Sequence, residues 1–476
     1  MSRLEAEVLG LPTFEQLSKV PAGRVDADDL VRLGERGDVD TVICAMPDLW
    51  GRLVGKRVTV PTFREIAAGR EELHVSMYLF VVDIDMEPRP GYALTSWEDG
   101  FPDCRLVPDL ATLRVVPWLE RTAIVICEPL AEDSDEPIAI SPRVILRRQL
   151  DRYAAAGMTL KCATELEFFL FADDHAAAWE KRYRDLRPLS YYRADYHVLQ
   201  STRDDWFLRT VRGAMDAADI EIEFSKSEWG LGQQEVNLRY ADALEMADRH
   251  VLYKNGVKEM ADLAGLTATF MAKPAIGEIG SSCHIHCSVW DGDGAAALFS
   301  SDDPEGDRRL SSFVAGQVEH GRELTLLLAP TVNSYKRFQD GQFAGTNLGW
   351  AVDNRTGGLR VVGKGSGRRL EHRIPGADVN PYLAVAALAA AGLAGLQGAL
   401  TPPPPLTGNA ADNPDVPRVP RDLGGALALF EASALARSAF GDDAFEHLCN
   451  FHRQELEAFN HETVTDWELV RYFERV

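Results

Sequence analysis

Two glutamates separated by one residue lie in Thr164–Phe171 (TELEFFLF), where aromatic and aliphatic residues are typical of a β-strand. Because side chains alternate across a strand, Glu165 and Glu167 share one face, and Leu166 and Phe168 share the other. Two neighbouring carboxylates repel each other unless a cation compensates them. We therefore interpret this face as a candidate metal site. A solvated outer face explains the same pattern and stays open as an alternative.

Cysteines and histidines alternate in Cys283–Cys287 (CHIHC), a pattern that suggests zinc. On a strand, this alternation places His284 and His286 on one face and both cysteines on the other. Four tetrahedral ligands cannot come from opposite faces of one strand, which argues against a zinc site. What remains is a pair of histidines on one side, preceded by Gly280-Ser-Ser282. The alternative is a pair of core histidines whose nitrogens are hydrogen-bonded.

Three further carboxylates accompany these residues. Glu371 and Arg373 share a face in Leu370–Ile374 (LEHRI), which is either an exposed edge strand or a carboxylate–guanidinium pair in a cleft. Glu228 and Glu235 flank a glycine-containing turn that can direct both at one point. Five carboxylates and a histidine are mainly oxygen ligands, a set that suits Mg²⁺ or Mn²⁺ better than zinc or copper.

Arginines are frequent in the same part of the chain. Mg²⁺ and Mn²⁺ usually accompany phosphates, and guanidinium groups bind phosphate and carboxylate oxygens. For any one arginine alone, a surface salt bridge is the simpler explanation. The candidates are Arg337, Arg355, Arg360, Arg368, Arg369 and Arg373.

The composition is that of a globular protein, with 476 residues of which 46% are hydrophobic and 26% charged. The formal charge of −23 argues against nucleic acid or an anionic membrane as the main partner. Seven scattered cysteines and an N-terminus without a basic, apolar leader predict a reducing, cytoplasmic location. The apolar run 382–400 is rich in Ala and Gly, which predicts a closely packed buried helix and no membrane span.

Two domains are predicted to position these residues. Residues 1–38 are expected to form a helical lead-in, and short β-like runs dominate from residue 40 to 137. Ser141 and Pro142 are a typical helix start, so the boundary is placed near residue 137. Beyond it, strand and helix patterns alternate, so the predicted domains are 1–137 and 138–476.

Seven motifs, taken in their order along the chain, resemble those of a bacterial type I glutamine synthetase, and the resemblance runs from about residue 40 to the C-terminus. The resemblance implies an α+β fold, with an N-terminal β-grasp domain followed by a catalytic domain with an antiparallel sheet and helices. It also implies a dodecamer of two hexameric rings, with each site shared between neighbouring subunits. The motifs are PDLWGRLVGKR (47–57), TELEF (164–168), EWGLGQQE (228–235), FMAKP (270–274), GSSCHIH (280–286), NSYKR (333–337) and RLEHRIPGADVNPYL (369–383).

The resemblance further implies a reaction, in which the γ-carboxylate of glutamate attacks the γ-phosphate of ATP and an amine then displaces phosphate. By motif, one Mg²⁺ or Mn²⁺ ion is expected at Glu167, Glu228 and Glu235, and a second at Glu165, His284 and Glu371. The residues expected to bind ATP are His286, Ser288, Arg360 and Arg369, and those expected to bind glutamate are Gly280, Arg337 and Arg373. Catalytic roles are expected for Arg355 and Asp48.

One departure from the family pattern predicts the substrate. Ammonium-using members carry a glutamate in a flap after NSYKR, whereas this chain has Phe343, whose ring lines an apolar slot or faces a cation but cannot accept a proton. The ammonium-binding loop is also replaced, by Asp48–Arg52. We therefore predict a γ-glutamyl-amine ligase for a polyamine such as putrescine, or for ethanolamine, in amine assimilation or detoxification.

Two alternatives stay open. The first is an ammonia-dependent glutamine synthetase whose base has moved to Asp340 or Asp48. The second, of another class, is a non-catalytic structural protein with the same fold. That reading predicts eroded metal ligands, but all six expected positions hold Glu or His.

Overall fold

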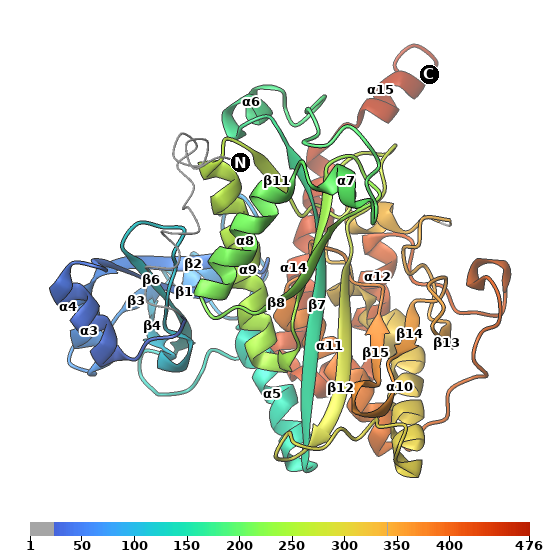
Figure 1. Cartoon of the computed structure of the whole chain (residues 1–476), viewed down its shortest axis with the longest axis horizontal. Helices are drawn as coiled ribbons and strands as arrows, with labels where there is room; N and C mark the ends of the chain where they lie inside the picture. The colour runs from blue at the N-terminus through green and yellow to red at the C-terminus, as the bar shows by residue number, and fades with distance from the viewer. Residues whose placement is uncertain (1–22, 340) are drawn as a thin grey trace.

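Two β-sheets organise the chain, whose computed structural model describes residues 23–339 and 341–476 (Figure 1). In the smaller sheet the strand order is β2-β1-β6-β4-β3, with β5 beside β6. β1 pairs antiparallel with β2 and parallel with β6, and helices α3 and α4 pack together beside it. These elements are β1 (Thr41–Pro47), β2 (Leu53–Thr59), β3 (His74–Ser76), β4 (Asp103–Pro108), β5 (Arg114–Val115), β6 (Thr122–Leu130), α3 (Ala27–Arg36) and α4 (Val60–Ala67).

The helical part of the predicted lead-in is therefore α3, and residues 1–22 lie outside the described part of the chain. Asp26 begins the helix by accepting a hydrogen bond from the Asp29 backbone N–H, and Gly37 ends it in the left-handed conformation. The predicted α+β fold is confirmed.

The larger sheet has the order β13-β14-β15-β12-β7-β9-β8, with β10 and β11 also paired to β7. Its strands pair antiparallel, as predicted, except that β13 and β14 are parallel. The strands are β7 (Met158–Phe171), β8 (Ile222–Ser227), β9 (Gln233–Leu238), β10 (Ala241–Asp242), β11 (Thr267–Thr269), β12 (Cys283–Asp291), β13 (Trp350–Val352), β14 (Leu359–Val362) and β15 (Arg369–His372).

Helices cover one face of this sheet (Figure 1). α5 and α9 pack on β7, and α11 packs against α5, α9 and α10. The main helices are α5 (Pro142–Ala155), α8 (Asp205–Ala217), α9 (Ala243–Leu263), α10 (Pro304–Leu328), α11 (Pro381–Gln397), α12 (Leu423–Glu431), α13 (Ala434–Phe440) and α14 (Asp442–Glu462). Shorter helices are α6 (His175–Glu180), α7 (Val198–Ser201) and α15 (Asp466–Tyr472), and 3₁₀ turns lie at Met77–Phe80, Leu110–Thr112, Ser334–Arg337, Gly365–Gly367 and Ala410–Asp412.

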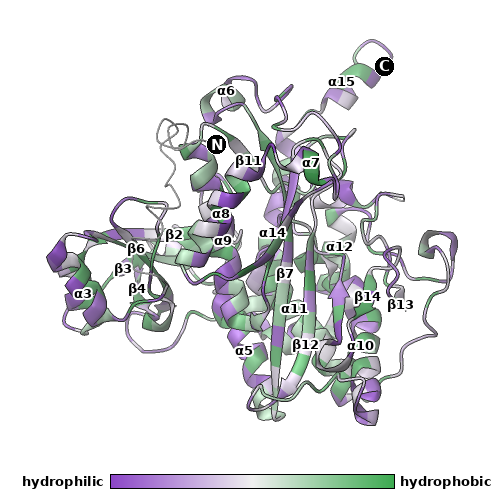
Figure 2. Cartoon of the chain, in the orientation of Figure 1, coloured by the Kyte–Doolittle hydropathy of each residue, from purple (hydrophilic) through white to green (hydrophobic). Residues whose placement is uncertain are grey.

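α11 is the closely packed buried helix that the sequence predicts, and Figure 2 shows it as a mainly hydrophobic element behind the sheet. A Cβ added at Gly395 would lie 2.1 Å from the backbone oxygen of Ser312 on α10, and one at Gly392 would overlap the Phe313 ring. Only glycine lets these two helices approach so closely. Among the described helices, none is long and apolar enough to cross a membrane.

A buried arginine joins the two sheets. Arg143, near the start of α5, donates to Asp248 on α9 at 3.0 and 2.9 Å and to Asp109 beside the small sheet at 2.7 Å. The hydroxyl of Tyr382 on α11 donates to the same Asp248 at 2.7 Å. This network fixes the small sheet against the helices that support the large one.

Replacing Arg143 by methionine should therefore lower the free energy of unfolding by about 3–5 kcal/mol, because Asp248 would remain buried without its counter-charge. Urea titration followed by circular dichroism measures this loss. The matched control is Arg147→Met on the same helix, where a 38% exposed side chain pairs with Glu128 at 2.7 Å and should cost less than about 1 kcal/mol. Equal losses of unfolding free energy in the two variants would contradict the role of Arg143 as the buried counter-charge of Asp248.

Candidate active site

The first cluster of carboxylates lies on the face of the large sheet that is opposite the helices. Glu167 on β7 is directly opposite Glu235 on β9 in the strand register. Glu228 follows β8, at the start of the turn that leads into β9. One ligand oxygen from each of Glu167, Glu228 and Glu235 lies within 4.8 Å of the others. The structure thus brings together the three residues predicted for one metal ion.

Burial and mutual repulsion act on two of these carboxylates. Burial, followed by the charge of Glu228, raises the pKa of Glu167, and burial together with the charges of Glu167 and Glu228 raises that of Glu235. Glu167 Oε2 accepts hydrogen bonds from the Ser282 backbone N–H at 2.8 Å and from the Gln233 amide at 3.1 Å. Two buried acids and one partly buried acid, with oxygen donors only, are a suitable binding site for a hard divalent cation.

The second cluster lies beside the first on the same face. Ligand atoms of Glu165, His286 and Glu371 lie within 4.8 Å of one another. His284 is the histidine that the sequence predicts as a ligand of the second metal ion. It is also close to both carboxylates, because its Nδ1 lies 3.2 Å from Glu165 Oε2 and 3.7 Å from Glu371 Oε1. His284 Nε2 is buried and has no hydrogen-bond partner among the described residues. The predicted set is therefore assembled, with His286 as an additional neighbour.

The charge balance at the second cluster is different. Glu371 is buried, yet the charges of His284 and Arg373 outweigh this burial and lower its pKa to about 2. Arg360 Nη1 also donates to Glu371 Oε2 at 2.7 Å. Burial alone would raise the pKa of Glu165, but hydrogen bonds with His284 and His286 lower it. The lowered pKa values of Glu165 and Glu371 in this cluster contrast with the raised pKa values of Glu167 and Glu235 in the first.

The cysteines of CHIHC take no part in either cluster. Cys283 and Cys287 are buried on the opposite face of β12, where Cys287 Sγ lies 3.7 Å from Cys162 Sγ. The donors that remain are carboxylate oxygens and imidazole nitrogens, which fit Mg²⁺ or Mn²⁺.

Two buried guanidinium groups lie next to the clusters. Arg337 Nη1 donates to Ser282 Oγ at 3.1 Å, and Arg373 Nη2 donates to the backbone oxygen of Phe343 at 3.3 Å. The Nε atoms of both arginines are buried without a hydrogen-bond partner in the described chain. A Cβ at Gly280 would lie 2.3 Å from Arg337 Cγ, so glycine is needed for the arginine to lie there. Unpaired buried donors on cationic groups indicate an anionic ligand such as a carboxylate.

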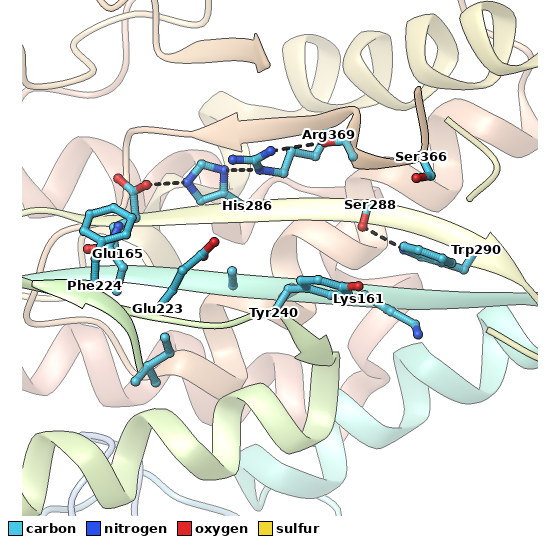
Figure 3. A pocket seen from close by; sticks show the side chains of 15 residues that line it. Lys161, Glu165, Glu223, Phe224, Tyr240, His286, Ser288, Trp290, Ser366 and Arg369 are labelled. Carbon is cyan, nitrogen blue, oxygen red and sulfur yellow. Dashed lines mark hydrogen bonds and ion pairs between the residues drawn. The ribbon is translucent and has the colours of Figure 1, made fainter. Parts of the chain in front are cut away.

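A cavity of about 280 Å³ opens beside the second cluster, and Glu165 and His286 of that cluster form part of its wall (Figure 3). At its charged end, Arg369 Nε donates to His286 Nδ1 at 3.0 Å, and His286 Nε2 lies 2.8 Å from Glu165 Oε1. At its other end the rings of Tyr240 and Trp290 are stacked with centroids 6.2 Å apart. The cavity therefore combines a cationic end suited to phosphate with a flat aromatic end suited to a base.

Other residues of this site line the cavity or lie further away. Ser288 is in the cavity wall and accepts a hydrogen bond from Trp290 Nε1 at 2.9 Å. Arg355 is exposed in the loop between β13 and β14, and Arg368 pairs with Asp307 outside both clusters. Phe343 is 62% exposed. Asp340 lies outside the described residues.

Asp48 is not brought to the clusters within the described chain. It is 3% exposed in the loop between β1 and β2, and its Oδ2 accepts from Arg52 Nε at 2.7 Å. Burial raises its pKa, although Arg52 opposes this effect. The side-chain amide of Asn380, which caps α11, donates to the backbone oxygen of Asp48 at 3.0 Å.

Three contributors to the site were not predicted. Gln233 and Ser282 lie inside the motifs EWGLGQQE and GSSCHIH, so the motifs themselves were the available signal. Lys226, whose ammonium group contacts Glu228, lies outside every motif and carries no such signal.

Comparisons with known proteins agree with this geometry. The sequence profile of the family described as "Glutamine synthetase, catalytic domain" matches residues 139–472. The gamma-glutamylethanolamide synthetase GlnA4 of Streptomyces coelicolor is 46% identical over 94% of this chain and 96% of its own. The glutamate–isopropylamine ligase of a Pseudomonas species is 36% identical over 92% and 96%. The solved GmaS/ADP complex (conformation 1) is 27% identical, with a TM-score of 0.81 over 94% of this chain and 99% of that one.

The fold and the two donor clusters define a catalytic domain of the glutamine synthetase type. The chain belongs to the glutamine synthetase family, as its motifs predict. Its similarity to two enzymes named for joining glutamate to amines confirms the predicted resemblance to the amine-ligating members.

The unbalanced first cluster predicts a specific pH dependence. Because the folded-state pKa values of Glu167 and Glu235 are raised, folding favours their protonated forms, and stability falls as pH rises above the unfolded pKa. Metal-free protein should therefore melt at a lower temperature at pH 9 than at pH 6, and added Mn²⁺ should reduce this difference.

The matched variant is Glu235→Gln, which keeps the shape of the side chain but removes one of the repelling charges. It should raise the melting temperature of metal-free protein at pH 9 and weaken the stabilisation by Mn²⁺. Differential scanning calorimetry with and without MnCl₂ makes both measurements. A variant that melts lower without metal would refute the repulsion between these carboxylates.

Proposed function

We propose that this protein is an ATP-dependent ligase that joins the γ-carboxylate of glutamate to an amine and releases ADP and phosphate. One observation carries the proposal: two adjacent donor clusters lie between two buried guanidinium groups, whose Nε atoms have no hydrogen-bond partner in the described chain, and a cavity with a cationic and an aromatic end. The names of the two amine-ligating relatives support the same reaction class.

Within this proposal each group of residues has a separate task. Arg337 and Arg373 bind the carboxylates of glutamate, and Arg360, Arg369 and His286 orient the phosphates of the nucleotide. Divalent cations are general to the family, and we propose two Mg²⁺ or Mn²⁺ ions per site, one in each cluster. Bound there, they neutralise charge on the transferred phosphoryl group. Arg355 is proposed to reach the same phosphoryl group from its exposed loop.

The amine is proposed to lie against Phe343. The backbone oxygen of Phe343 is held by Arg373, and its 62% exposed ring offers an apolar or cation-facing surface. Ethanolamine is the first candidate, because the relative with 46% identity is named for its γ-glutamyl amide. Putrescine is the second. A catalytic role for Asp48 stays a prediction, since in a single chain its carboxylate is bound to Arg52.

We also propose a dodecamer of two hexameric rings and a cytoplasmic location. Assembly into rings would place the β1–β2 loop, which carries Asp48, beside the site of a neighbouring subunit. A reducing compartment is supported by the seven cysteines, all of which are buried and free. We further propose a division into domains of 1–137 and 138–476. The match to the family's catalytic domain begins at residue 139, close to this boundary.

Phosphate release tests the function directly. With glutamate, ATP and Mg²⁺, the protein should release phosphate in the presence of ethanolamine or putrescine at least about tenfold faster than with ammonium, a difference of ~1.4 kcal/mol. Glu167→Ala should abolish release with every amine while leaving the oligomer intact by light scattering. Fast turnover with ammonium and none with the larger amines would establish the ammonia-dependent alternative. Absence of both Mn²⁺ and ATP binding in calorimetry would establish the non-catalytic one.

The flap position provides a finer test. Phe343→Glu should raise kcat/KM for ammonium by about tenfold or more, because a carboxylate can accept the proton that the phenyl ring cannot. The control Phe343→Ala should weaken use of the larger amine without improving use of ammonium. An unchanged amine preference in both variants would show that Phe343 does not line the amine site.

A further inference from the structure

A lysine lies at the edge of the first cluster. Lys226 on β8 is directly opposite Glu235 on β9 in the strand register, and its side chain is only 15% exposed. Its ammonium group contacts Glu228, lies 3.1 Å from Asp195 Oδ1 and is 4.3 Å from the centroid of the Tyr196 ring. One cation is thus shared between a cluster carboxylate and a carboxylate outside the cluster.

Both oxygens of Glu228 are already engaged. Oε1 contacts Lys226, and Oε2 accepts from the backbone N–H of Trp229 at 3.2 Å. A divalent cation held by Glu167, Glu228 and Glu235 would share the Glu228 carboxylate with the ammonium group, and the two cations would repel each other. The ammonium group is the mobile one, because it sits on a flexible four-carbon stem.

Asp195 is an alternative ion-pair partner for Lys226. Asp195 belongs to a loop that lies on the Glu228 turn, where Arg193 stacks on the Trp229 ring at 3.7 Å and pairs with Glu278 at 3.5 Å. These contacts hold the loop in place independently of Lys226. An ammonium group that leaves Glu228 therefore still has the Asp195 carboxylate within reach.

We propose that Lys226 is an exchangeable counter-ion of the first cluster. It neutralises Glu228 when no divalent cation is bound and turns to Asp195 when one binds, so that the lysine lowers the metal affinity of this cluster and stabilises its metal-free form. This inference rests on the metal site of the proposed function, but concerns the competition at Glu228 and not the reaction.

Isothermal titration of the full-length protein with MnCl₂, without nucleotide, tests the exchange. Lys226→Met keeps the length of the stem and removes the charge, so one of the two binding phases should become about fivefold tighter or more. Metal-free Lys226→Met should also melt at a lower temperature, and Mn²⁺ should restore it. Asp195→Asn should act oppositely and weaken the same phase, because Lys226 loses its alternative partner.

Lys161→Met is the matched control. Lys161 lies on the same sheet, is 19% exposed and packs over an aromatic ring, Trp290, at 4.6 Å, but it contacts neither cluster. Its Mn²⁺ affinities should equal those of the wild type. Unchanged or weaker binding by Lys226→Met, or unchanged binding by Asp195→Asn, would overturn the exchange. If the wild type binds no Mn²⁺, the proposed metal site itself fails, which is a distinguishable result.

Discussion

Repulsion between acidic side chains on adjacent strands is the constraint on which this structure depends. Strand alternation places Glu165 and Glu167 on one face of β7, and pairing adds Glu235 from β9. The opposite face, with Leu166 and Phe168, is buried under helices and cannot be exposed without losing the core. A register shift of one residue would move the carboxylates into that core, so hydrophobic packing keeps the repelling charges together.

The repulsion between carboxylates is compensated differently in the two clusters. Around Glu371 the protein supplies its own cations, Arg360 and Arg373, and the carboxylate is ionised without any ligand. Around Glu235 the protein supplies mainly Lys226, shared with Asp195, and the pKa values of Glu167 and Glu235 stay raised. Stability of the first cluster therefore depends on an added cation, whereas the second has its geometry set in advance by arginines. If the first cluster binds a divalent cation as proposed, it is the part of the site where metal binding and folding are most strongly linked.

Periodicity and short motifs were sufficient to predict which residues share a face of β7 and of β12, and to predict the buried helix α11. They were also sufficient to argue against a zinc site at Cys283–Cys287. Each of these conclusions depends only on residues close in sequence. The parallel pairing of β13 with β14 was not predictable in this way, because the sequence pattern does not encode strand direction. The Lys226–Asp195 contact spans 31 residues and involves a loop with no regular pattern. Asp48 was assigned by motif, but its pairing with Arg52 and the packing of its loop on Asn380 arise from tertiary contacts.

The loop that carries Phe343 connects the arginine proposed to bind glutamate with the residue proposed to line the amine site. Phe343 has a positive φ of 52°, a conformation that costs a bulky L-residue energy and persists only where neighbouring contacts enforce it. One such contact is the hydrogen bond from Arg373 to its backbone oxygen, and Arg373 also contacts Glu371 of the second cluster. A shift of the guanidinium on glutamate binding would therefore move the backbone that presents the Phe343 ring. If Phe343 lines the amine site as proposed, substrate selection depends on the backbone held by Arg373 as well as on the identity of the side chain.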